Sequence, residues 1–126
     1  MSALTEARGA LVDALNGLAG ATVYEYVPEA IAAPAAVVQP GDPYLASGEE
    51  GVPFGWFRIR HKVTLVADVA TNEVVTVALD AMIEGALTEL LVAGLAVEMV
   101  SEPYVFQANE NLHLAADLSV SNTIEF

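Results

Sequence analysis

The segment FRIRHKVTLVADV, from Phe57 to Val69, sets the architecture of the chain. Its odd-numbered positions are apolar or His61, and most of its even-numbered positions are polar, which is the period of two that is typical of a β-strand. At ~3.3 Å per residue, these residues span roughly 43 Å, about twice the usual length of a strand. We therefore expect part of this strand to project and to pair with another chain.

The other elements follow from periodicity and from breaker residues. Ser2 to Asn16 has apolar residues at helical spacing, and Thr71 or Asn72 can cap a second helix that runs to about Ala93. The further predicted strands are Thr22 to Val27, Ala35 to Gln39, Leu95 to Glu102 and Leu112 to Ser121. Pro40 to Gly55 is rich in proline and glycine and is predicted to be a loop.

This order of elements, α-β-β-β-α-β-β, predicts an α+β fold. A mainly antiparallel sheet with both helices packed on one face fits it best. The length of 126 residues predicts a single domain that spans the whole chain, residues 1–126, with the long loop at residues 40–55.

Composition and charge exclude several classes of function. Seventeen acidic residues against four basic ones give a formal charge of −13, which excludes general binding to a nucleic acid backbone. The chain has no cysteine, so it can form neither a disulfide nor a zinc-thiolate site. Four acidic residues interrupt the apolar stretch from Val74 to Val100, which argues against a membrane span. The first residues do not resemble a signal peptide, so we expect the chain to be cytosolic at synthesis.

No catalytic or metal-binding motif is recognisable. The sequence has no nucleotide-binding glycine motif, no hydrolase Ser motif and no H-E-x-x-H. His61 falls on the apolar face of its strand and His113 on the polar face of another, so we expect a packed His61 and an exposed His113. No enzymatic activity, cofactor or metal is predicted.

One cluster of charge points to contacts with a partner. Arg58, Arg60 and Lys62 hold three of the four basic groups, and the pleat of the strand puts them on one face. They are either a solvated face steadied by nearby acids or a stripe that meets an acidic patch of another subunit. Phe54 and other aromatic residues nearby are either interface anchors or a closure of the core edge. The candidate interface residues are Tyr44, Trp56, Phe57 and Phe126, the acidic Asp42, Glu49 and Glu50, and the three basic residues.

The run APAAVVQPGDPYL, Ala33 to Leu45, carries a resemblance to a known family. It precedes a strand that starts with Trp and Phe, a hydrophobic helix and two more strands. With the helix-first order and the length, the chain resembles the tail terminators, or tail completion proteins, of siphophages of actinobacterial hosts.

This resemblance implies a structural virion protein at the head-proximal end of the tail. It implies a homo-oligomeric ring, usually of six subunits, that caps the tail tube, ends its polymerisation and offers a surface to the head-tail connector proteins. Genomic DNA would pass through the lumen without specific binding, and no membrane is involved.

Two other functions are compatible with the sequence. A head-tail connector, whether an adaptor or a stopper, has a similar size and a related role. A small-molecule-binding or enzymatic α+β domain, with a pocket between sheet and helices, belongs to a different class.

Overall fold

The computed structural model describes residues 2–18, 20–69, 73–108 and 110–126. Two helices, α1 (Ala3–Leu15) and α2 (Glu73–Val92), accompany six strands. The strands are β1 (Thr22–Tyr24), β2 (Ala35–Ala46), β3 (Trp56–Val69), β4 (Ala96–Val100), β5 (Tyr104–Ala108) and β6 (Asn111–Glu125). The expected α+β fold, with its mostly antiparallel sheet and this order of elements, is confirmed, and β5 is a small additional strand.

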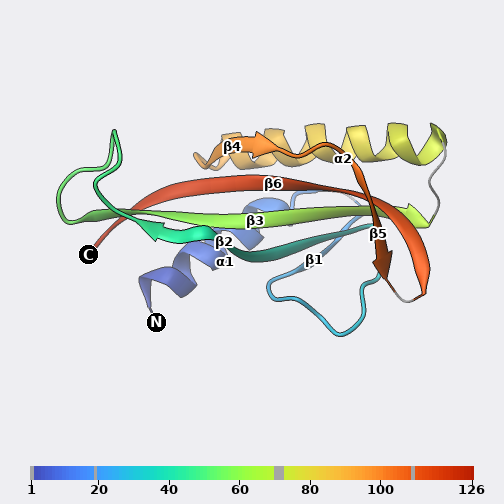
Figure 1. Cartoon of the computed structure of the whole chain (residues 1–126), viewed down its shortest axis with the longest axis horizontal. Coiled ribbons are helices and arrows are strands. Elements are labelled where there is room, and N and C mark those ends of the chain that lie inside the picture. The colour runs from blue at the N-terminus through green and yellow to red at the C-terminus, as the bar shows by residue number, and fades with distance from the viewer. Residues whose placement is uncertain (1, 19, 70–72, 109) are drawn as a thin grey trace.

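The sheet has the order β1-β2-β3-β6-β4, with β5 also paired with β6. Among the described strands, the short β1–β2 pair is parallel and the other pairs are antiparallel. In Figure 1 the long strands β3 and β6 run side by side, and both helices lie behind the sheet. The sheet therefore has one face that carries the helices and one face without them, which we call the open face.

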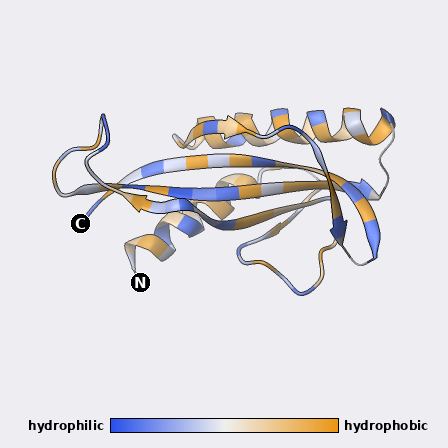
Figure 2. Cartoon of the chain, in the orientation of Figure 1, coloured by the Kyte–Doolittle hydropathy of each residue, from blue (hydrophilic) through white to orange (hydrophobic). Residues whose placement is uncertain are grey.

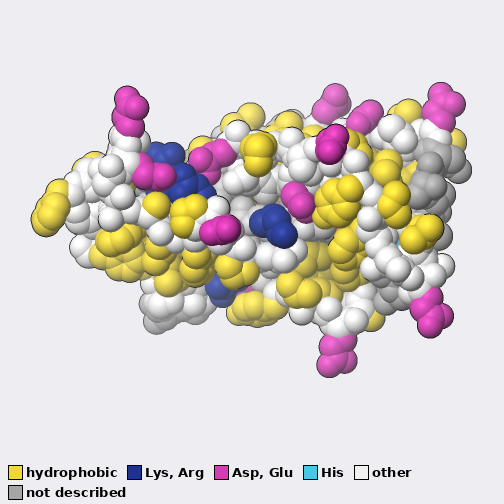
Figure 3. Space-filling view, in the orientation of Figure 1, with side chains coloured by type: hydrophobic (Ala, Val, Ile, Leu, Met, Phe, Trp, Pro, Cys, Tyr) yellow, Lys and Arg dark blue, Asp and Glu magenta, His cyan; other side chains and the backbone are white. Residues whose placement is uncertain are grey.

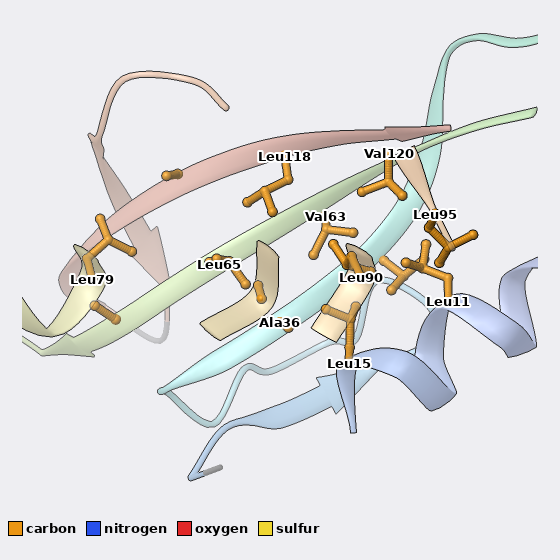
Figure 4. Close-up of a cluster of buried hydrophobic side chains, with 14 of the residues drawn as sticks. Leu11, Leu15, Ala36, Val63, Leu65, Leu79, Leu90, Leu95, Leu118 and Val120 are labelled. Carbon is orange, nitrogen blue, oxygen red and sulfur yellow. The ribbon is translucent and has the colours of Figure 1, made fainter. Parts of the chain in front are cut away.

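The core lies between the sheet and the two helices. One buried cluster joins Leu11 and Leu15 of α1, Leu79 and Leu90 of α2, and Leu65 of β3, together with other sheet residues (Figure 4). The alternation of apolar and polar residues along β3 and β6 places the apolar ones against the helices (Figure 2). Burial of these side chains stabilises the fold at ~25 cal/mol per Å² of apolar surface.

Helix α1 is capped at its N-terminus by Ser2. The hydroxyl of Ser2 accepts a hydrogen bond from the backbone N–H of Thr5 at 3.1 Å. Thr71 and Asn72, the residues expected to cap the second helix, lie outside the described residues. Gly94, with φ of 81°, ends α2 as expected.

The expected loop from Pro40 to Gly55 is shorter than predicted, because β2 continues to Ala46. The register with β3 shifts between Pro40 and Leu45 and then resumes. Prolines are tolerated here because β1 pairs with β2 only at residues 35–37, so the later part of β2 has a free edge. The loop proper is residues 47–55.

The expectation that β3 projects and pairs with another chain is wrong for Trp56 to Val66. β6 pairs with this stretch from Trp56 to Val66, and β2 pairs with it from Arg58 to Val66 apart from the register shift. The length of β3, 14 residues, is explained by the two long strands beside it in the same chain, β2 with 12 residues and β6 with 15.

Candidate assembly surface

The loop between β2 and β3 carries the most exposed aromatic residue among the described ones. The side chain of Phe54 is completely exposed. The loop extends beyond the end of the sheet in Figure 1. Its inner side frames a pocket of about 540 Å³, lined in part by Val52, Pro53 and Trp56.

The other aromatic candidates at this end close off the sheet. Phe57 and Phe126 pack edge to face, with ring centroids 5.3 Å apart. The backbone N–H of Phe126 donates a hydrogen bond to the carbonyl oxygen of Gly55 at 3.0 Å. Trp56 and Phe57 are half-buried, and Phe126 remains largely exposed. Of the aromatics around the loop, Phe54 alone projects freely from the described part of the chain.

The structure separates Tyr44 from these aromatics. Its hydroxyl accepts a hydrogen bond from Arg8 of α1 at 3.1 Å, and its ring meets His61 edge to face at 5.7 Å. Tyr44 therefore ties β2 to α1 on the helix-bearing side.

The three basic residues lie on the open face, but two of them are neutralised within the chain. Arg60 donates to both carboxylate oxygens of Glu49 at 3.0 Å and to Glu98 of β4 at 3.0 Å. These hydrogen bonds, the one with Glu98 first, raise the pKa of Arg60. The Nε of Arg58 lies 3.6 Å from Glu49. Glu49 thereby fixes the base of the loop to β3. This contact corresponds to one of the two interpretations of the basic residues, a strand face stabilised by nearby acidic residues.

Lys62 is different from these two arginines. Among the described residues it forms no ion pair, and its side chain is exposed. It lies beside a shallow pocket of about 290 Å³ on the open face. Figure 3 shows this face, with basic side chains (dark blue) set among acidic ones (magenta).

A polar network stiffens the floor beside this pocket. Gln39 donates to the hydroxyl of Thr64 at 3.2 Å, and Thr64 donates to Asp117 at 2.7 Å. Tyr104 donates to the same carboxylate oxygen of Asp117 at 2.9 Å. Burial, followed by the interaction with Asp117, raises the pKa of Tyr104 to about 12.

The two histidines are both buried. His61 is packed as expected, with an exposed fraction of 4%. Burial, followed by the positive charge of Arg8, lowers the pKa of His61 to about 4. The expectation that His113 is exposed is wrong: it is buried, and its Nδ1 lies 2.9 Å from the carbonyl oxygen of Ala67.

The burial of His113 has a local cause. A second small apolar cluster, Ala35, Val66 and Ala115, lies at this end of the sheet and includes Phe106 at its margin. Phe106 of β5 pairs directly with His113 of β6. The side of the predicted strand that was expected to be polar is thus covered at one end by β5, a strand that was not predicted from the sequence.

Asp42 and Glu50 remain at the surface. Asp42 is exposed and lines the pocket beside Lys62, whereas Glu50 is exposed in the loop. The sequence reading missed Met99 and Ser119, which line the same pocket. Met99 is 65% exposed in the short strand β4, and the strand pattern gives no signal for it.

Among the described residues, no group of three or more His, Cys, Asp or Glu side chains is arranged to hold a metal ion. In the same part of the chain, no helix is long and apolar enough to cross a membrane.

Comparison with models of known protein families finds no match, and comparison with curated protein sequences finds none either.

Proposed function

We propose that this chain is a structural protein of a phage tail, whose copies form a ring that caps the tail tube, ends its polymerisation and presents a surface to the head. The observation that carries the proposal is the complete exposure of Phe54 on a loop that extends past the sheet. When a partner covers an aromatic side chain that is exposed to water, the free energy falls, and aromatic residues are enriched at the energetic centres of interfaces.

Further apolar surface supports association. Val74 and Val77 near the start of α2, and Leu91 and Val92 at its end, are largely exposed. The helix has no basic residue, so charge pairs on its outer face cannot supply its stability. The mean hydropathy of +0.50 is high for a domain of this size.

The edges of the sheet favour contacts through side chains. The free edge of β2 contains Pro40 and Pro43, and the pairing of β4 with β6 is interrupted between Val97 and Met99. Prolines and bulges are the devices that keep sheet edges from pairing with other chains. A projecting loop that docks elsewhere on an identical copy makes a heterologous contact, and such contacts close into rings when the rotation between copies allows it.

The charge fits a channel for DNA. Each copy carries −13, so a ring multiplies a strong negative charge around its lumen. A duplex that passes through such a lumen is repelled by the walls and does not adhere to them. The proposal requires neither a cofactor nor a catalytic group.

The test is a polymerisation assay with the tail tube protein of the same phage. Tubes are grown with and without this protein, and their lengths and ends are measured by negative-stain electron microscopy. We expect shorter tubes with added density at one end. Tubes of unchanged length with bare ends would contradict the proposal, and another acidic protein of similar size serves as the control.

A further inference from the structure

The pocket beside Lys62 has the chemistry of a receptor for one aromatic side chain. We call it the Lys62 socket and define it by Pro40, Gly41, Asp42, Lys62, Met99 and Ser119. Its volume of about 290 Å³ can hold one large side chain and is small for a drug-sized ligand. It lies near the middle of β3, whose residue Lys62 pairs with Ser119 of β6.

Asp42 and Asp117 line the socket together with Lys62, and the two carboxylates repel an acidic occupant. A neutral aromatic ring avoids this repulsion. It also gains from the ammonium group of Lys62 through a cation–π interaction, and from the thioether of Met99 through a sulfur–aromatic contact.

We propose that Phe54 of a second copy of this chain occupies the Lys62 socket. The exposed aromatic residues among the described ones are Tyr26, Phe54 and Phe126, and Phe54 is the most exposed of them. Phe126 already packs against Phe57, and Tyr26 lies under Arg8 at 5.3 Å. Phe54 is therefore the aromatic side chain that this chain leaves free to dock.

The contact has to be intermolecular. Lys62 is six residues further along β3 than Trp56, which is about 20 Å at ~3.3 Å per residue. The loop extends from the sheet in the opposite direction (Figure 1). A loop of one copy in a socket of the next is a heterologous contact, and its repetition gives the ring of the proposed function. This inference rests on the proposed function in one respect only, namely that copies of the chain associate.

The absence of cysteine from the chain allows a direct test. Two single-cysteine variants are prepared: Glu50→Cys in the loop, which leaves Phe54 in place, and Ser119→Cys in the lining of the socket. A short bismaleimide is added to each variant alone and to their mixture, with and without tail tube protein. We expect the dimeric product in the mixture and little product from either variant alone.

Three controls make the result specific. Adding Phe54→Ala to the Glu50→Cys variant should lower the yield about tenfold, as expected for loss of an interface anchor. Met99→Ala in the Ser119→Cys variant should also lower it. A mixture of Glu50→Cys with Thr88→Cys, on the exposed side of α2, should give background yield.

Several results would overturn the inference. These are strong cross-linking of Glu50→Cys with itself, a yield that does not respond to Phe54→Ala, and no mixed product at the highest soluble concentration with or without tube protein. Normal capping of tubes by the Phe54→Ala variant would refute the socket and leave the ring function intact. A mixed product together with bare tube ends would support the contact and refute the function in the tail.

Discussion

Lowering the pH from 7 to 5 should destabilise the protein through a single side chain, His61. The residue is 4% exposed, and no described residue bonds to its Nε2. The charged Arg8 and the ring of Tyr44 face it. Burial and Arg8 lower its pKa to about 4, whereas the pKa of histidine in an unfolded chain is ~6.5.

The sign follows from proton binding. Below pH ~6.5 His61 binds a proton in the unfolded chain, whereas in the folded chain it stays unprotonated until about pH 4. Stability is therefore lost as the pH falls through this window. The linkage relation gives a loss of about 2 kcal/mol between pH 7 and pH 5 and at most about 3 kcal/mol at lower pH.

The assay is urea unfolding at pH 7 and pH 5, with the wild type beside His61→Leu. The carboxylates titrate in both proteins, so the difference between the two pH-dependent changes isolates the histidine. We expect the wild type to lose about 2 kcal/mol more than the variant. An equal loss in both proteins, or an NMR titration of the His61 ring with a pKa near 6.5, would refute the reasoning.

Four other substitutions test the packing and the polar contacts. Gly41→Ala should lower the free energy of unfolding, measured in urea, by about 1–3 kcal/mol, because the added Cβ would lie 2.9 Å from the Arg60 backbone. Gly9→Ala in α1, where a Cβ meets nothing within 4 Å, should raise the free energy of unfolding by about 0.5–1 kcal/mol. The reverse order of stabilities would show that the contacts are misassigned. Glu49→Gln should lower the free energy of unfolding by about 1 kcal/mol at low salt and by less at high salt, because the bonds of this side chain to Arg60 weaken. The loop should also be cleaved faster by a protease. Unchanged proteolysis would show that Glu49 does not hold the loop. We expect a phenol absorbance change near pH 12 in the wild type that is absent from Tyr104→Phe. A wild-type spectrum without that phase would contradict the burial of this hydroxyl.

The sequence pattern predicted the sheet because side-chain period reports directly which residues share a face. The alternation from Phe57 to Val69 predicted β3, and the helical spacing before Asn16 predicted α1. The same pattern cannot report what covers a face. His113 lies on the side expected to be polar, and it is buried because Phe106 and a small apolar cluster lie there.

The candidate site shows the same limit. The strand pattern placed Arg58, Arg60 and Lys62 together, but the ion pairs of Arg60 come from a loop residue and from β4, which are distant in sequence. Proline and glycine predicted a loop from Pro40, whereas a free strand edge tolerates both residues. The socket arises only when β2, β3, β4 and β6 align, so no local motif could predict it.

The central claim is that copies of this chain join through their exposed apolar surface. Native mass spectrometry across a wide range of concentrations, alone and with the tail tube protein, tests it most directly. The account predicts a discrete assembly whose mass is a small integer multiple of 13.2 kDa, either free or bound to tube protein. A single species of 13.2 kDa at every concentration that also does not bind the tube protein would contradict this claim.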